Sequence, residues 1–107
     1  SEQEIATTKA SIALCLMALN RLDQAKQYIL DVLHYYEKNM AEQDGHYSAA
    51  LCAAGEYCWR KGDHKKAISY FERALDFNIS YLGDSHGNEI IRKNIEKIKS
   101  TTEALHT

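Results

Sequence analysis

The sequence predicts an all-α fold of about five helices, in which antiparallel helical hairpins stack on one another. Three observations support this prediction. Apolar residues recur at three- and four-residue steps along most of the chain. Short polar stretches separate these helical segments, and all of them except the turn at 20–22 contain glycine. The core positions of the first half also reappear in the second half at a constant offset, which indicates duplication of one structural unit.

The central hairpin, residues 48–82, shows the pattern most clearly. Its first helix carries Leu51, Ala54, Gly55 and Cys58 on one face, and its second carries Ala67, Phe71, Ala74, Leu75 and Leu82. Lys61-Gly62-Asp63 forms the turn, where glycine can adopt the left-handed conformation and Asp63 can cap the next helix. The small residues predict a close helix crossing, with Ala54 and Gly55 facing Ala67 and Ala74.

These residues resemble the tetratricopeptide repeat (TPR) family. In that family a large residue, a small pair with glycine and an aromatic are followed by alanine, phenylalanine and alanine on the second helix. Leu51, Ala54-Gly55, Ala67, Phe71 and Ala74 match these positions, whereas Cys58 replaces the aromatic and Ile79 replaces the usual closing proline. The resemblance implies a right-handed TPR-like solenoid that serves as a protein-interaction or scaffold module and binds a protein or peptide partner without a cofactor.

The first half of the chain predicts an equivalent hairpin. Residues 2–20 form a helix, followed by a turn at 20–22 and a second helix over 24–40, for which Asp23 is the expected cap. A polar break follows at 42–45. The first helix is expected to face the second with one apolar stripe, which consists of Ile5, Ile12, Leu16 and Leu19.

The two halves align at a constant offset of 42 positions, as from Ala25 to Ala67. The other matched pairs are Tyr28 with Tyr70, Ile29 with Phe71, Val32 with Ala74, Leu33 with Leu75 and Gly45 with Gly87. This repeat is longer than the ordinary TPR, which has about 34 residues. The chain has no proline to end the second helix of each hairpin early, so that helix is expected to continue for about two more turns.

The connector at 82–87 (LGDSHG) resembles the link of the long TPRs in kinesin light chains and nephrocystin-like proteins, with Gly87 where those families have proline. The predicted units within one domain are therefore a hairpin over about 2–41, a hairpin over about 46–82 and a terminal helix over about 88–105. Ile91, Ile95 and Ile98 form an apolar stripe on the terminal helix. This stripe suits either a cap or the first helix of a further repeat, in what we expect to be a fragment of a longer protein.

The resemblance implies that the first helix of each repeat lines a concave groove. The groove residues expected to bind the partner are Cys52, Glu56, Trp59, Arg60 and Asn94. Trp59 beside Arg60 can anchor a peptide through apolar contact and charged hydrogen bonds. Alternatively, Trp59 packs under a neighbouring helix and Arg60 is solvated. Because the lysines and asparagines with which other TPRs hold a carboxylate are absent, an apolar or mixed peptide is expected.

The first helix also predicts an uncovered face. Residues 12–19 (IALCLMAL) are apolar on all sides, and Leu14 and Met17 point away from the stripe expected to meet the second helix. A preceding repeat, a ligand or a second copy of the chain could cover them. The alternative function is therefore homo-oligomerisation, for example as a homodimer, with no peptide ligand.

Composition excludes several other classes of protein. The 107 residues carry a net charge of -2 with acidic and basic residues interspersed, which argues against nucleic acid as a partner. The apolar run over 12–19 is too short to span a membrane. Three cysteines without metal-site spacing are expected to be reduced and buried in a cytoplasmic protein. The sequence contains no catalytic motif, and we expect no enzyme activity, no cofactor and no metal site.

Overall fold

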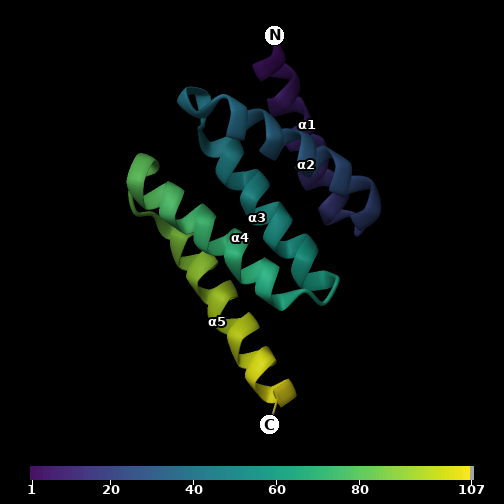
Figure 1. Cartoon of the computed structure of the whole chain (residues 1–107), viewed down its shortest axis with the longest axis vertical. Coiled ribbons are helices and arrows are strands. Elements are labelled where there is room, and N and C mark those ends of the chain that lie inside the picture. Colours follow the sequence, from purple (N-terminus) through teal and green to yellow (C-terminus); the bar gives the residue numbers. More distant parts are fainter. Residues whose placement is uncertain (107) are drawn as a thin grey trace.

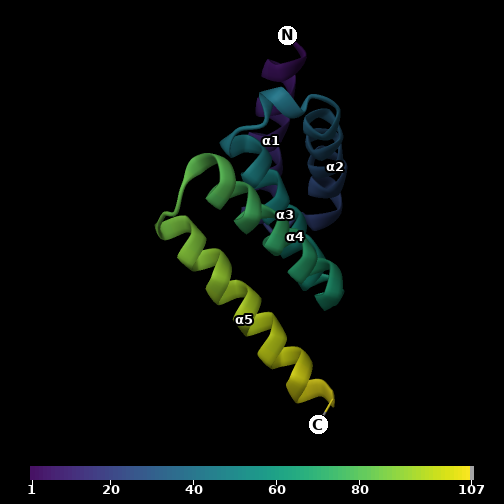
Figure 2. The same cartoon turned by 60° about the vertical axis from the view of Figure 1, so that its left-hand side comes forward.

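The computed structural model describes residues 1–106, with side chains described for residues 1–104, and within this range the chain is all-α. Five α-helices and two short helical segments follow one another along the chain (Figures 1 and 2). Their bounds are α1 (Glu2–Ala18), α2 (Leu22–Lys38), η1 (Met40–Glu42), α3 (Gly45–Arg60), α4 (His64–Phe77), η2 (Asn78–Leu82) and α5 (His86–His106). The predicted fold class is confirmed.

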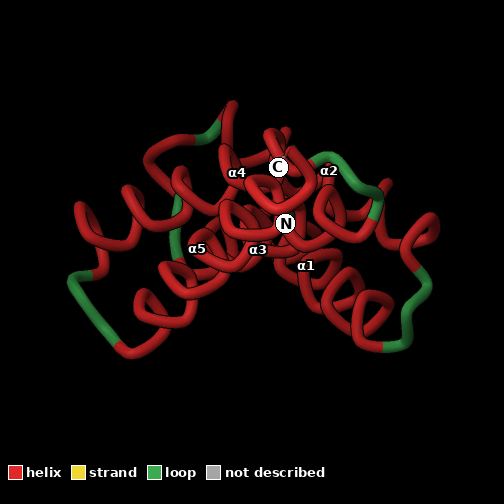
Figure 3. The backbone as a smooth tube through the Cα atoms, turned by 90° about the horizontal axis from the view of Figure 1, so that it is seen from below, coloured by secondary structure: helices red, strands yellow, loops and turns green. Residues whose placement is uncertain are grey.

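The helices are arranged as two hairpins, α1 with α2 and α3 with α4, followed by α5, which packs against α4. Figure 3 shows α1, α3 and α5 along one side of the molecule and α2 and α4 along the other. The two hairpins contact each other through α3, which packs against both α2 and α1. One core runs through both hairpins and α5, from Ala10 to Ile98.

The two hairpin turns have the same hydrogen bonding. Asn20 and Gly62, 42 positions apart, both take left-handed conformations, with φ of 59° and 86°. In the first turn the backbone N–H of Arg21 donates to the carbonyl of Leu16 over 2.8 Å, and the equivalent bond in the second turn has the same length. This is the Schellman motif, which satisfies carbonyls at a helix end. Asparagine can replace glycine in the first turn because it tolerates this conformation.

The helix starts confirm one predicted cap and contradict another. The Asp63 carboxylate accepts the backbone N–H of Lys66 and caps α4, as predicted. Asp23 is not a cap, because α2 already begins at Leu22 and has no side-chain cap. The Asp23 carboxylate instead pairs with Lys61 over 2.8 Å and so joins the start of α2 to the turn between α3 and α4.

Helices α3 and α4 meet where the sequence predicts a close crossing. A Cβ atom added to Gly55 would lie 2.9 Å from the ring of Phe71, which is closer than a carbon contact allows. Ala54, Ala67 and Ala74 are also buried. Because these residues are small, the two helix backbones approach closely and the Phe71 ring packs directly on the α3 backbone.

Helix α1 packs in a different orientation from the predicted one. Its buried residues are Ala6, Ala10, Ala13 and Met17, whereas Ile5, Ile12 and Leu19 are exposed. The prediction that the isoleucine and leucine stripe faces α2 is therefore wrong for these three residues. Alanines let α1 lie close to both α2 and α3, and a helix that is apolar on all sides has no periodicity that selects one face.

The position of Met17 also differs from the sequence prediction, which places it on the uncovered face. Its side chain is only 3% exposed and belongs to the core, so this prediction is wrong. Helix α3 packs against this side of α1, which accounts for the burial. Leu14, the other residue predicted on that face, is 46% exposed.

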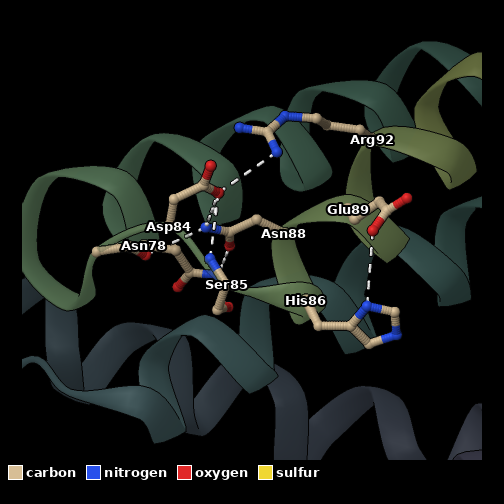
Figure 4. A network of polar contacts seen from close by, with 8 residues as sticks. Asn78, Asp84, Ser85, His86, Asn88, Glu89 and Arg92 are labelled. Atoms are coloured by element: carbon tan, nitrogen blue, oxygen red, sulfur yellow. Dashed lines mark hydrogen bonds and ion pairs between the residues drawn. The ribbon is translucent and has the colours of Figure 1, made fainter.

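A buried asparagine of α5 joins this helix to η2 and to the connector that follows η2 (Figure 4). Asn88 is fully buried, and its Nδ2 donates to the carbonyl of Gly83 over 3.2 Å and to Asp84 Oδ1 over 3.1 Å. Its Oδ1 accepts a hydrogen bond from Asn78 Nδ2 over 2.9 Å. Arg92 lies 3.4 Å from the same Asp84 oxygen. These contacts fix the angle at which α5 leaves the connector, where Gly83 has a φ of 84°.

We predict that Gly55→Ala lowers the free energy of unfolding by about 1–2 kcal/mol. The added methyl group overlaps the Phe71 ring, and this overpacking outweighs the higher helix propensity of alanine. Urea denaturation followed by circular dichroism measures the change. Gly45→Ala is the matched control, because a methyl group there meets nothing within 4 Å. Equal or greater stability of Gly55→Ala would contradict the close crossing.

A second prediction concerns the pH dependence of stability. The hydrogen bond from Asn88 and the charge of Arg92 lower the pKa of Asp84 below its usual value. The unfolded chain therefore takes up this proton more readily than the folded chain. The stability that Asp84 contributes is present above about pH 4 and is lost as the pH falls below it.

Asp84→Asn should consequently lose less stability than the wild type when the pH is lowered from about 6 to about 3. Denaturation curves across this interval test the prediction. Asp76→Asn, at an exposed position on α4, is the control and should follow the wild type. A wild-type curve and an Asp84→Asn curve of the same slope would show that the contacts around Asp84 do not stabilise the fold.

Candidate functional site

A groove of about 500 Å³ lies between α3 and α5. Both helices pack against α4, and α4 thereby holds them on the two sides of the groove. Leu14 of α1 extends the wall beyond α3. The lining includes Leu14, Ala49, Cys52, Glu56 and Trp59 on one side and Ile90 and Asn94 on the other.

The structure brings most of the predicted partner-binding residues together in this groove. Cys52, Glu56 and Trp59 lie on α3 at helical spacing, and Asn94 faces them from α5. Leu14, predicted as part of a self-association face, also lines the groove. Whether these residues bind a partner stays a prediction, but they share one concave surface.

The sequence left open whether Trp59 lies in the groove or packs against neighbouring helices, and in the structure it does both. Its side chain is partly buried and packs against the hydrophobic core, and it also lines the groove. Lys97 of α5 places its ammonium nitrogen 5.2 Å from the centre of the indole ring. This cation–π contact links α3 to α5 at one end of the groove. Sequence patterns do not reveal the role of Lys97, because Trp59 is distant from it along the chain and lies on another helix.

Arg60 does not line the groove. Its guanidinium donates to the carbonyl of Met17 over 3.1 Å and to Asn20 Oδ1 over 3.2 Å, which ties α3 to the end of α1. Its other terminal nitrogen lies 2.5 Å from Glu56. The negative charge of Glu56 in the groove is therefore neutralised by Arg60. The Arg60 guanidinium is in turn fixed by its hydrogen bonds to Met17 and Asn20.

Cys52 is an apolar part of the groove wall and not a reactive group. Burial, with a smaller contribution from the charge of Glu56, raises the pKa of the Cys52 thiol to about 11. The thiol is therefore protonated at neutral pH and is a weak nucleophile. Side chains such as Ala49 and Ile90 extend the same apolar surface.

Asn78 and Ile90 line the groove and are absent from the residues that the sequence predicts for the site. Asn78 donates to Asn88, whereas its own Oδ1 is buried without a hydrogen-bond partner among the described residues. The repeat offset aligns Asn78 with Tyr36 of the first repeat. Asn78 is thus an amide at a position where the first repeat has a buried aromatic residue. This difference between the repeats is the sequence signal that could have identified Asn78.

The cysteines differ from their predicted burial. Cys15 is exposed, because no helix among the described residues covers that face of α1, while Cys52 and Cys58 are partly buried. All three are free thiols. Within residues 1–106 no group of three or more histidine, cysteine, aspartate or glutamate residues is placed to hold a metal ion. No helix in the same range is both long enough and apolar enough to cross a membrane.

Comparison with known proteins identifies a family. The family model described as tetratricopeptide repeat matches residues 4–80, which spans both hairpins through most of η2. No curated protein and no solved structure matches the chain. The match is compatible with the long repeats of kinesin light chains but does not single them out. The chain belongs to the tetratricopeptide repeat family, whose members serve generally as protein-interaction and scaffold modules.

Proposed function

We propose that the chain binds a peptide segment of a partner protein in the groove between α3 and α5. The observation that carries this proposal is the groove itself, in which Trp59 is available beside apolar side chains from both helices. Large aromatic residues in partly desolvated pockets contribute much of the binding energy at protein interfaces.

The lining favours a peptide of mixed character with at least one large apolar side chain. Trp59, Ile90 and Leu14 offer apolar contact, whereas Asn94 offers an amide that can hydrogen-bond to a peptide backbone. Glu56 is already paired with Arg60, so a strongly charged peptide gains little from either residue.

We further expect binding without catalysis, because the one thiol in the groove is protonated at neutral pH and is a weak nucleophile. We also expect no cofactor and no metal. Free thiols are typical of the cytoplasm, where glutathione and thioredoxin keep them reduced. We therefore propose a cytoplasmic protein partner. Neither a nucleic acid nor a membrane is expected to occupy the groove.

Peptides selected on the wild-type chain from a random phage-displayed library test this proposal. Ile90→Glu should weaken their binding about tenfold or more, because it places a carboxylate in the apolar wall. Trp59→Ala should also weaken binding by removing the aromatic contact. Isothermal titration calorimetry with the synthetic peptides measures both effects.

Ile79→Glu is the matched control for Ile90→Glu. Ile79 is 48% exposed and Ile90 is 50% exposed, but only Ile90 lines the groove. Circular dichroism establishes that each variant is folded. Peptides that bind Ile90→Glu as tightly as they bind the wild type, or a library that yields no binders, would contradict the proposal.

A second candidate function is assembly through α1. Ile5, Ile12 and Leu19 are exposed at seven-residue spacing, which forms an apolar stripe along this helix. A seven-residue spacing is that of one of the two core positions in a coiled-coil heptad. A second copy of the chain is the occupant that we propose for this stripe, which replaces the Leu14 and Met17 face predicted from the sequence.

Under this second proposal the chain forms a dimer that Ile12→Glu combined with Leu19→Glu converts to a monomer. Each buried carboxylate would lose its hydration without gaining a partner. Light scattering over a range of concentrations measures the molar mass. Leu30→Glu, which changes an exposed leucine on α2, should leave the dimer intact. A monomeric wild-type chain at every concentration would exclude assembly through α1.

A further inference from the structure

A second concave site of about 400 Å³ lies between α2 and α4. Figure 3 places these helices on the side of the molecule away from α1 and α5. We refer to this site as the α2–α4 pocket. Its α3 residues, Ala54, Tyr57 and Cys58, alternate along the helix with Cys52, Glu56 and Trp59 of the groove. The two sites therefore use different faces of α3.

The floor and walls of this pocket are apolar and aromatic. Buried Ile29 and Ala54 form the floor, and partly buried Tyr57 and Tyr70 form the walls. Leu30 is exposed beside them. One cation lies near each of these aromatic rings. Lys61 lies 5.8 Å from the Tyr57 ring centre, and Arg73 lies 5.5 Å from the Tyr70 ring centre.

The pocket has the opposite charge to the chain as a whole. The full chain has a net charge of -2, whereas the lining contains three cations, Lys26, Lys66 and Arg73, and one acidic residue, Asp63. Arg73 is paired with Glu37 over 3.3 Å. Lys26 has no ion pair among the described residues, and Lys66 has only a long contact of 3.9 Å with Asp63. Two lysines are therefore available to a ligand.

Two ion pairs between elements lie at the ends of this pocket. Asp23 with Lys61 and Glu37 with Arg73 each join α2 to the second hairpin, at opposite ends of the stretch that lines the pocket. Between these two ion pairs, the pocket is lined by residues that include Lys26, Leu30, Lys66 and Tyr70. A lysine at the rim of an apolar pocket recognises an acidic group next to an apolar one.

We propose that the α2–α4 pocket is a second binding site, for an acidic peptide segment that carries one large apolar side chain. The apolar side chain enters between Tyr57 and Tyr70 and contacts Leu30. Flanking carboxylates pair with Lys26 and Lys66. We choose an acidic peptide because the lining of the pocket is positively charged, whereas the chain as a whole is negatively charged and does not attract such a peptide. The site is independent of the groove, so the chain could hold two segments at once.

The probe is a short fluorescein-labelled peptide with one phenylalanine between glutamates, and fluorescence anisotropy at low salt measures its binding. Lys66→Glu should weaken binding about tenfold, and Leu30→Ser should weaken it too. Lys65→Glu and Leu82→Ser are the matched controls, because they make the same changes at exposed positions outside the pocket. Ile90→Glu in the groove should leave binding unchanged.

Replacing the phenylalanine of the probe by serine separates the two parts of the proposal. Loss of binding with this peptide would confirm that the apolar side chain is recognised. Equal losses with Lys65→Glu and Lys66→Glu would indicate attraction to any lysine and overturn the site. A loss with Ile90→Glu would assign the acidic peptide to the groove instead. Absence of binding to the wild-type chain would overturn the proposal outright.

Discussion

Close approach of the two helices within each hairpin is the constraint on which this structure depends. At Gly55 the backbone of α3 lies against the Phe71 ring, and no side chain larger than hydrogen fits there without a shift. Ala13 has the equivalent position in the first repeat and is also buried. Because the crossing fixes how each hairpin closes, it also fixes which face of α3 is left for the groove and which for the α2–α4 pocket.

The groove depends on a second, polar constraint. Helix α5 forms one of its sides, and fully buried Asn88 fixes the start of that helix through hydrogen bonds to the connector and to Asn78. A buried asparagine with several partners is costly to replace, because each partner would lose its hydrogen bond. The Lys97–Trp59 contact joins the same two helices further along. The distance between α3 and α5 across the groove thus depends on the Asn88 hydrogen bonds and on the Lys97–Trp59 contact.

The repeat offset made much of this fold predictable, and the first helix shows where prediction fails. Glycine, alanine and phenylalanine at fixed spacing identified the α3–α4 crossing, and the resemblance to the tetratricopeptide repeat placed Cys52, Glu56 and Trp59 on the groove face of α3. Helix α1 is apolar on all sides, so its periodicity could not select Ala10 and Ala13 over Ile5 and Ile12. Applying the offset to the first helices would have matched Ala13 to Gly55. No local pattern, however, reveals that Arg60 bonds to the end of α1, a helix from the other repeat.

The central claim is that the groove between α3 and α5 is where this tetratricopeptide repeat chain binds a partner peptide. The most direct measurement is the set of amide chemical-shift changes that a library-selected peptide causes in the ¹⁵N-labelled chain. We expect the largest changes on α3 around Cys52 and Trp59 and on α5 around Ile90 and Asn94, the two sides of the groove. Changes concentrated instead on α1 around Ile12, or between α2 and α4, would contradict the claim and move the binding function to another surface.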